Sequence, residues 1–161
     1  MQAAGIDRRA HWNSLIGFFY EPHPELKVRQ FSSILDFQMF AAIVGYNDGK
    51  RKQVSGEKMS IPWRVVANNQ TCIELINLVA LASTKNDAKI LKADNDLERV
   101  SIFEEYSENG FQIIESWTKD NATDIFKDKI IEQKIIELKN SVTLSDESSD
   151  TEDVPPIIDF Q

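Results

Sequence analysis

The residues of this sequence best suited to binding a charged partner are cations in one short segment. Lys50, Arg51 and Lys52 are consecutive and follow a turn-forming stretch. If Lys58 and Arg64 join them on one face, the five cations could contact nucleic-acid phosphates. Such binding would weaken steeply with added salt, because counterions are released when phosphates are neutralised. The alternative is a loop whose positive charges stay in water.

A second group of residues is acidic. Glu104, Glu105 and Glu108 recur at helical spacing, shortly after Asp94 and Asp96. Paired carboxylates can bind a metal ion or act as acid and base. No histidine or further acid is placed to complete such a site. We therefore expect these carboxylates to lie on a solvated helix face, with no metal bound.

Residues for nucleophilic chemistry are few. His11 and His23 are the only histidines, and Cys72 is the only cysteine and lies in a very apolar segment. The sequence lacks the Gly-x-Ser-x-Gly, P-loop and dinucleotide-binding motifs. We expect Cys72 to be a small buried hydrophobe. The sequence therefore predicts a protein that is not an enzyme and uses no cofactor.

The C-terminal segment, 141–161, has a different character. It contains six acidic residues and no Lys or Arg, so it accounts for −6 of the net charge of −8 and leaves about −2 for the rest. We expect this acidic tail to be disordered, because so few apolar residues cannot offset the entropy of ordering. It could dock on a partner protein, solubilise the chain, or fold back over the basic segment. The residues expected to make a docking contact are Asp150, Glu152, Asp153, Ile157, Ile158 and Phe160.

Length and composition favour one soluble domain. The chain has 161 residues, of which 42% are hydrophobic, enough for one proper core. Its first residues lack the apolar core of a signal peptide, and no window has the roughly 18–20 apolar residues of a membrane span. We expect a cytoplasmic protein with no membrane partner.

The pattern of apolar residues predicts a mainly α fold: a compact helical bundle with at most a short irregular strand pair. Apolar spacing indicates a helix from Glu25 to a cap at Gly45, and a second helix over 70–83 capped by Asn68-Asn69 and forming the centre of the core. Further helices are predicted from about residue 95 to a break at Asn109-Gly110, over 111–119, and over 122–140. The strip 61–66 is predicted to be extended.

These elements suggest three parts. Residues 1–24 form an N-terminal aromatic and basic arm or a short helix, residues 25–140 form the helical domain, and residues 141–161 form the acidic tail.

Several blocks of the sequence resemble one known family. The blocks are VGYNDGKRK, IPWRVV, CIELINLVALAS and LERVSIFEEYSENGFQIIESW. Together they are similar to the small accessory proteins associated with dnd systems, the bacterial loci for DNA phosphorothioation and the restriction linked to it. The similarity covers roughly residues 37–131, and FEEYSENG is its most distinctive part. The resemblance implies a mostly helical protein that serves bacterial antiviral defence, and it brings no catalytic motif.

The sequence and the resemblance lead to one functional expectation and two alternatives. We expect a non-catalytic accessory or adaptor subunit that assembles with larger proteins of the same locus, such as an ATPase, a helicase or a nuclease. The first alternative is a direct nucleic-acid-binding module that uses the basic loop 50–64. The second is an acidic DNA mimic that occupies a partner's groove. Only the nucleic-acid binder should lose its affinity when the charges at 50–52 are reversed.

Overall fold

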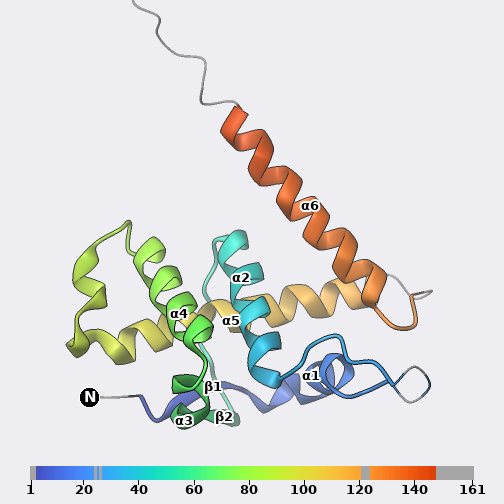
Figure 1. Ribbon diagram of the computed structural model, residues 1–161, viewed down its shortest axis with the longest axis horizontal. Coiled ribbons are helices and arrows are strands. Elements are labelled where there is room, and N and C mark those ends of the chain that lie inside the picture. Colours follow the sequence, from blue (N-terminus) through green and yellow to red (C-terminus); the bar gives the residue numbers. More distant parts are fainter. Residues whose placement is uncertain (1–2, 24, 26, 121–123, 148–161) are drawn as a thin grey trace, which may run out of the picture. The chain divides into compact units, whose positions relative to one another are not determined.

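The computed structural model describes residues 3–23, 25, 27–120 and 124–147, and it is mainly α-helical with one two-stranded sheet (Figure 1). It divides into two compact units, Met1–Asp120 and Asn121–Gln161. These units differ from the predicted division at residues 24 and 140. The N-terminal segment is an integral part of the first unit, and the second unit begins inside the predicted helical domain.

The N-terminal segment combines the two forms that were predicted for it. Strand β1 (Gly5–Arg9) continues into a 3-10 turn, η1 (Ala10–Trp12), and helix α1 (Asn13–Tyr20). β1 pairs antiparallel with β2 (Lys58–Pro62), so that Ile6 lies opposite Ile61. Both of these isoleucines are buried, which joins the sheet to the core. The sheet is the short strand pair that the prediction allowed.

Helix α2 (Ile34–Asp48) begins and ends later than predicted. Ser33 caps its start by accepting a hydrogen bond from the Asp36 backbone N–H at 3.0 Å. Gly49 ends it with a φ of 75°, a left-handed conformation that favours glycine. The predicted start at Glu25 and cap at Gly45 are therefore wrong. Gly45 lies inside the helix, at a close contact with the neighbouring helix α5.

Helix α5 (Asp96–Asp120) runs without a break through Asn109 and Gly110, where an interruption was predicted. α2 packs against α5 (Figure 1), and both glycines lie where the two backbones approach each other. A Cβ atom at Gly110 would overlap the Ala41 carbonyl oxygen, and one at Gly45 would overlap the Tyr106 carbonyl oxygen. These glycines let the two backbones touch, so their role is in packing rather than in ending helices.

Aromatic side chains of α1, α2 and α5 form one part of the core. Phe19, Phe37, Phe103 and Phe111 are fully buried, and the Phe37 ring lies 5.0 Å from that of Phe19 and 5.6 Å from that of Phe111. Offset and tilted ring pairs at such distances add to the hydrophobic stabilisation. Aliphatic side chains of β1, β2, α3 (Trp63–Ala67) and α4 (Gln70–Ser83) pack with α2 and α5 in a second part of the core.

Helix α4 (Gln70–Ser83) has the predicted bounds, and Asn69 caps it by accepting from the Cys72 N–H at 3.0 Å. Its inner side contributes Cys72 and Ile76 to the buried core cluster, while its outer side is exposed: Leu78 is 62% exposed. α4 covers one side of the α2–α5 pair (Figure 1). Two 3-10 turns, η2 (Ala88–Leu91) and η3 (Ala93–Asn95), connect α4 to α5.

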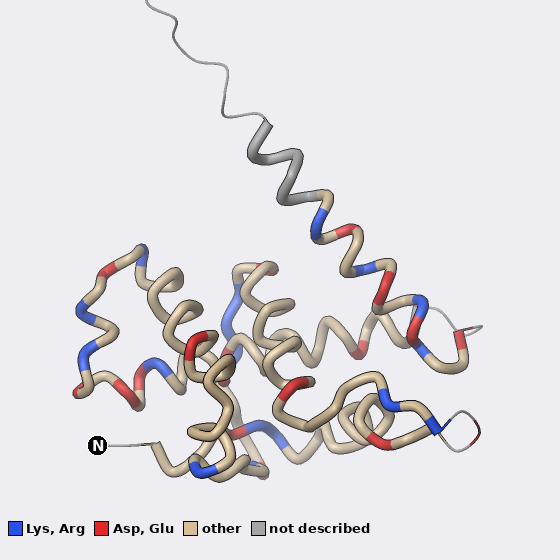
Figure 2. Tube along the Cα trace, in the orientation of Figure 1, with Lys and Arg blue, Asp and Glu red and all other residues tan. Residues whose placement is uncertain are grey.

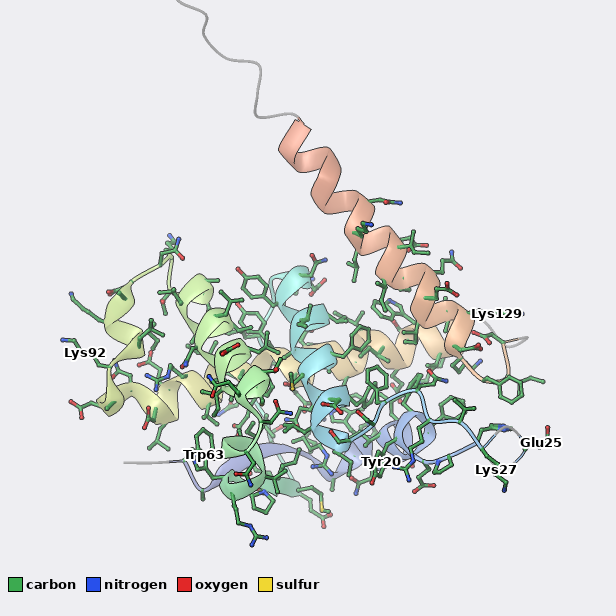
Figure 3. The ribbon with its side chains drawn as sticks, viewed as in Figure 1. Tyr20, Glu25, Lys27, Trp63, Lys92 and Lys129 are labelled. Atoms are coloured by element: carbon green, nitrogen blue, oxygen red, sulfur yellow. The ribbon has the colours of Figure 1, made fainter. Side chains whose placement is uncertain are left out.

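The strip 61–66 is extended only at its start. β2 ends at Pro62, and α3 (Trp63–Ala67) follows at once. Trp63 lies beside the two strands (Figure 3). Its backbone N–H donates to the Ala4 carbonyl, and its ring packs against the core. Proline cannot donate to a ladder, so it suits the end of a strand.

The second unit contains helix α6 (Asp128–Glu147). The Asp124 carboxylate accepts from the Ile130 N–H at 2.9 Å near the start of α6. The helix begins later than predicted and continues past Asn140 to Glu147. The division of the chain at residue 141 stays a prediction. The docking residues predicted between 150 and 160 lie outside the described residues. Within the described part of the chain, no helix is both long and apolar enough to cross a membrane.

Candidate functional site

Seven polar residues of α5 form one stripe along the helix. Positions three and four apart share a helix face, and this spacing selects Ser101, Glu104, Glu105, Glu108, Gln112, Glu115 and Lys119. We call this set the α5 stripe. Residues of β1, η1 and the loop after α2 contact it. Of the predicted cations, Arg51 and Lys52 make direct contacts with this stripe.

Glu108 is the most buried member of the α5 stripe, with 2% of its side chain exposed. Both of its carboxylate oxygens accept from the Trp12 indole N–H, each at 2.9 Å. The Arg9 guanidinium pairs with the same carboxylate and also lies 5.0 Å above the Trp12 ring. A carboxylate without water must be paired and hydrogen-bonded. Glu108 therefore fastens the N-terminal segment to α5.

Glu104 makes a second connection one turn earlier. Its carboxylate accepts from the Asp7 backbone N–H at 2.6 Å, and Asp7 in turn faces Lys58 at 3.5 Å. Burial raises the pKa of Glu104 to about 7, although the hydrogen bond from Asp7 favours the charged form. Glu104 thus holds β1 against α5 in a partly dry environment.

The cations of the basic loop are mostly paired with acids of the same unit. Lys50 lies 3.7 Å from the Asp48 carboxylate, and Arg51 lies 3.4 Å from that of Glu105. Lys52 differs, because its ammonium contacts the neutral side-chain oxygen of Gln112. Its backbone N–H donates to the Glu105 carbonyl at 3.0 Å, which fixes this part of the loop on α5.

The five predicted nucleic-acid contacts therefore do not form one free cluster. Arg51 and Lys52 contact α5, Lys58 pairs with Asp7 of β1, and Lys50 pairs with Asp48 of α2. Arg64 is exposed on α3 and makes none of the described contacts with the α5 stripe. Nucleic-acid binding by these residues stays a prediction. Much of their charge is already balanced within the unit.

The expectation of a solvated acidic face is wrong for Glu104 and Glu108, which are partly and almost fully buried. Apolar neighbours and hydrogen-bond donors from β1 and η1 cover them. The burial of these two carboxylates could not be inferred from the sequence, because the segment that contains β1 was predicted to be an arm or a short helix. Among the residues that the structure describes, no group of three His, Cys, Asp or Glu side chains could hold a metal ion.

Cys72 is fully buried, as predicted, and burial raises the pKa of its thiol to about 12. A thiol with so high a pKa supplies little thiolate, the reactive form, near neutral pH. Cys72 is thus a packing residue of the main core cluster.

Sequence reasoning missed Arg9, Trp12 and Gln112 as members of the site. One signal was available: Glu104, Glu108 and Gln112 recur every four residues on one face of this helix. Such a stripe requires polar or charged neighbours when the helix is buried on its other sides. Arg9 and Trp12 were not recognisable, because their contacts span almost a hundred residues of sequence.

The structure thus defines a mainly helical domain with a small sheet and a charged stripe along α5. Residues 24–153 match the family described as DNA sulphur modification system-associated protein 4, and the chain belongs to this family. The resemblance seen in the sequence is confirmed, and the match extends beyond residues 37–131 on both sides. Neither the curated proteins nor the solved structures give a significant match to this chain.

Proposed function

We propose that this chain is a non-catalytic adaptor that joins larger proteins of a DNA sulphur modification system. Membership of the family supports the setting. The acids best placed for catalysis, Glu104 and Glu108, hold β1 and η1 in place, which supports a role in assembly rather than chemistry. The partners we have in view are the large DNA-acting components of the same locus, such as an ATPase, a helicase or a nuclease, in the bacterial cytoplasm.

Helix α6 is the observation that carries this proposal. It belongs to a compact unit of its own, and two of its isoleucines are about half exposed: Ile135 by 47% and Ile136 by 51%. Red and blue alternate along the described part of the helix (Figure 2), so charges of both signs flank its apolar positions. Most of the stability of a helix in a protein comes from packing of its apolar face. Burying these side chains on a partner would stabilise it.

The partner surface that fits α6 is an apolar groove bordered by charges of both signs. In this mode of recognition, side chains three and four positions apart anchor the helix, and flanking ion pairs set its register. Leu138, which is partly buried, lies on the same side as Ile135 three residues earlier. We infer that this pair anchors the helix.

Direct nucleic-acid binding is the second candidate, and the ion pairs of the loop count against it. Lys50, Arg51 and Lys58 each lie within 4 Å of a carboxylate. Contact with phosphates would have to compete with these carboxylates.

The acidic DNA-mimic alternative depends on the tail, which lies mostly outside the described residues.

Co-purification from cells that express the whole gene neighbourhood tests the proposal. The tagged chain should recover a large protein component of the locus, and the recovery should persist after nuclease treatment. If recovery disappears with nuclease, the chain reaches its partners through nucleic acid and the adaptor proposal fails.

A further inference from the structure

A polar pocket of about 370 Å³ opens beside the α5 stripe. Three segments of the first unit build it: the end of β1 with η1, the loop after α2, and α5. The side chains that could serve a ligand are Arg9, His11, Lys52, Gln53, Ser55 and Gln112. Its volume lies within the range of small-molecule sites. Its lining is mostly polar, so it suits a charged ligand.

The charge balance of the pocket is positive once the internal ion pairs are counted. Two carboxylates also line it, Glu108 and Glu115. Glu108 is paired with Arg9, and Glu115 with Lys119 at 2.9 Å. Both negative charges are therefore already neutralised. The charge of Lys52 remains, because the group that accepts from its ammonium is the neutral amide of Gln112.

Lys52 is held in place for such a role. Its backbone N–H is bound to the Glu105 carbonyl, and its side chain is partly buried. Lys50 and Arg51 pair instead with Asp48 and Glu105. Of the three consecutive cations, Lys52 is the one that lines the pocket. A cation positioned before the ligand arrives loses less entropy on binding.

Hydrogen-bond donors surround this charge. Arg9 directs its Nε and one Nη atom at Glu108, and a guanidinium has five N–H groups in all. The remaining N–H groups, the Ser55 hydroxyl and the Gln53 amide can donate to a ligand. Donors from two different segments, β1 and the loop after α2, suit a tetrahedral anion, which offers oxygens in several directions, better than a planar carboxylate.

We propose that this pocket binds a phosphate-type oxyanion, with Lys52 as its charge partner and Arg9, Gln53 and Ser55 as hydrogen-bond donors. The oxyanion is either a small phosphate or phosphate ester, or a phosphodiester of a nucleic-acid strand. This site is independent of α6 and of the adaptor proposal. It also differs from the predicted basic cluster, because it uses one cation of that cluster with residues of β1, η1 and α5.

NMR titration of the full ¹⁵N-labelled chain tests this site, with inorganic phosphate, dAMP and a ten-nucleotide single-stranded DNA as probes at constant ionic strength. We expect saturable shifts of the backbone amides at 52–55. Saturation with phosphate or dAMP identifies a small ester as the source of the oxyanion. Saturation with the oligonucleotide only identifies a strand phosphate. No saturable shift at 52–55 with any probe would overturn the proposal.

Matched variants separate the pocket from general electrostatic attraction. Lys52→Gln should weaken binding about tenfold or more, because it removes a charge-assisted hydrogen bond. Lys50→Gln removes the same charge outside the pocket and should change the affinity less than about twofold. Equal losses in the two variants would contradict the proposal.

Gln53→Glu, at an exposed position, provides a second test. The new negative charge should abolish binding of the oxyanion, and unchanged binding in this variant would count against the site.

Discussion

A carboxylate that loses its water needs other hydrogen-bond donors, and Glu108 has donors from both Arg9 and Trp12. The cation and the indole come from the N-terminal segment, so one side chain of α5 fixes the course of β1 and η1. Glu104 does the same through the Asp7 backbone. At the scale of single residues, the distinctive FEEYSENG motif therefore binds β1 and η1 to α5 through its glutamates.

Removing the Glu108 carboxylate should destabilise the first unit strongly. In Glu108→Ala, the Arg9 guanidinium loses its partner and the buried Trp12 N–H loses its acceptor. Breaking a buried pair in this way costs about 3–5 kcal/mol of unfolding free energy. Urea denaturation measures the loss. Glu115→Ala is the control on the same stripe, because its pair with Lys119 is largely exposed and should change stability by less than about 1 kcal/mol. Equal effects would contradict the role assigned to Glu108.

The raised pKa of Glu104 predicts a pH-dependent stability. Its folded pKa of about 7 lies above its ordinary value of 4.5, so the folded chain binds the proton more tightly between these values. The resulting stabilisation is complete below about pH 4.5 and is lost as pH rises through 7. We expect a loss on the order of 2 kcal/mol between pH 5 and pH 8.

Glu104→Gln separates this contribution from other titrating groups. Gln mimics the protonated acid and can still accept from the Asp7 N–H, so the variant should lose less stability over the same pH range. Glu74→Gln, at an exposed position of α4, should keep the wild-type profile. Thermal melts at pH 5, 6, 7 and 8 are the measurement. If Glu104→Gln and the wild type showed parallel profiles, burial of this carboxyl would not control the pH dependence.

At the scale of elements, the α2–α5 crossing organises the first unit. The two backbones touch at Gly45 and Gly110, and the aromatic core lies along the same contact. The basic loop follows α2 directly, so its cations arrive beside the acids of α5. This proximity explains why the sequence contains a cationic run after α2 and an acidic stripe on α5.

Gly110→Ala should destabilise the crossing although alanine is the better helix former. The new Cβ would overlap the backbone of Ala41, and a rigid backbone cannot move aside cheaply. We expect a loss of at least about 3 kcal/mol. Gly17→Ala in α1 is the control, because the nearest atom to its new Cβ lies 3.6 Å away. That variant should gain about 0.5–1 kcal/mol. Chemical denaturation of both variants compares them, and a neutral Gly110→Ala would contradict the close crossing.

The elements that could be predicted are those set by local chemistry. The helix over 70–83 has its cap in the neighbouring sequence, and its bounds are confirmed. The same kind of reasoning failed at Gly45 and Asn109-Gly110, because a glycine that permits a close helix contact looks like one that ends a helix. Of the site, the acids and cations were predicted, but their pairing was not. It depends on the β1–β2 register and on contacts between distant segments.

At the scale of the whole molecule, we propose a different role for each of the two units. The first unit has a dense core, and several charges along α5 are paired with charges of the same unit. The second unit presents α6 with apolar side chains about half exposed. Family membership places the chain with a DNA sulphur modification system. The adaptor proposal assigns partner binding to α6.

The most direct test of this account compares two substitutions of exposed apolar residues in the co-purification experiment. Ile135→Asp places a charge on α6, whereas Leu78→Asp places the same charge on α4, where the exposed fraction is similar: 47% against 62%. The account predicts that Ile135→Asp abolishes nuclease-resistant recovery of the partner and that Leu78→Asp leaves it unchanged. Recovery that survives Ile135→Asp, or that is lost with Leu78→Asp instead, would contradict the role of α6.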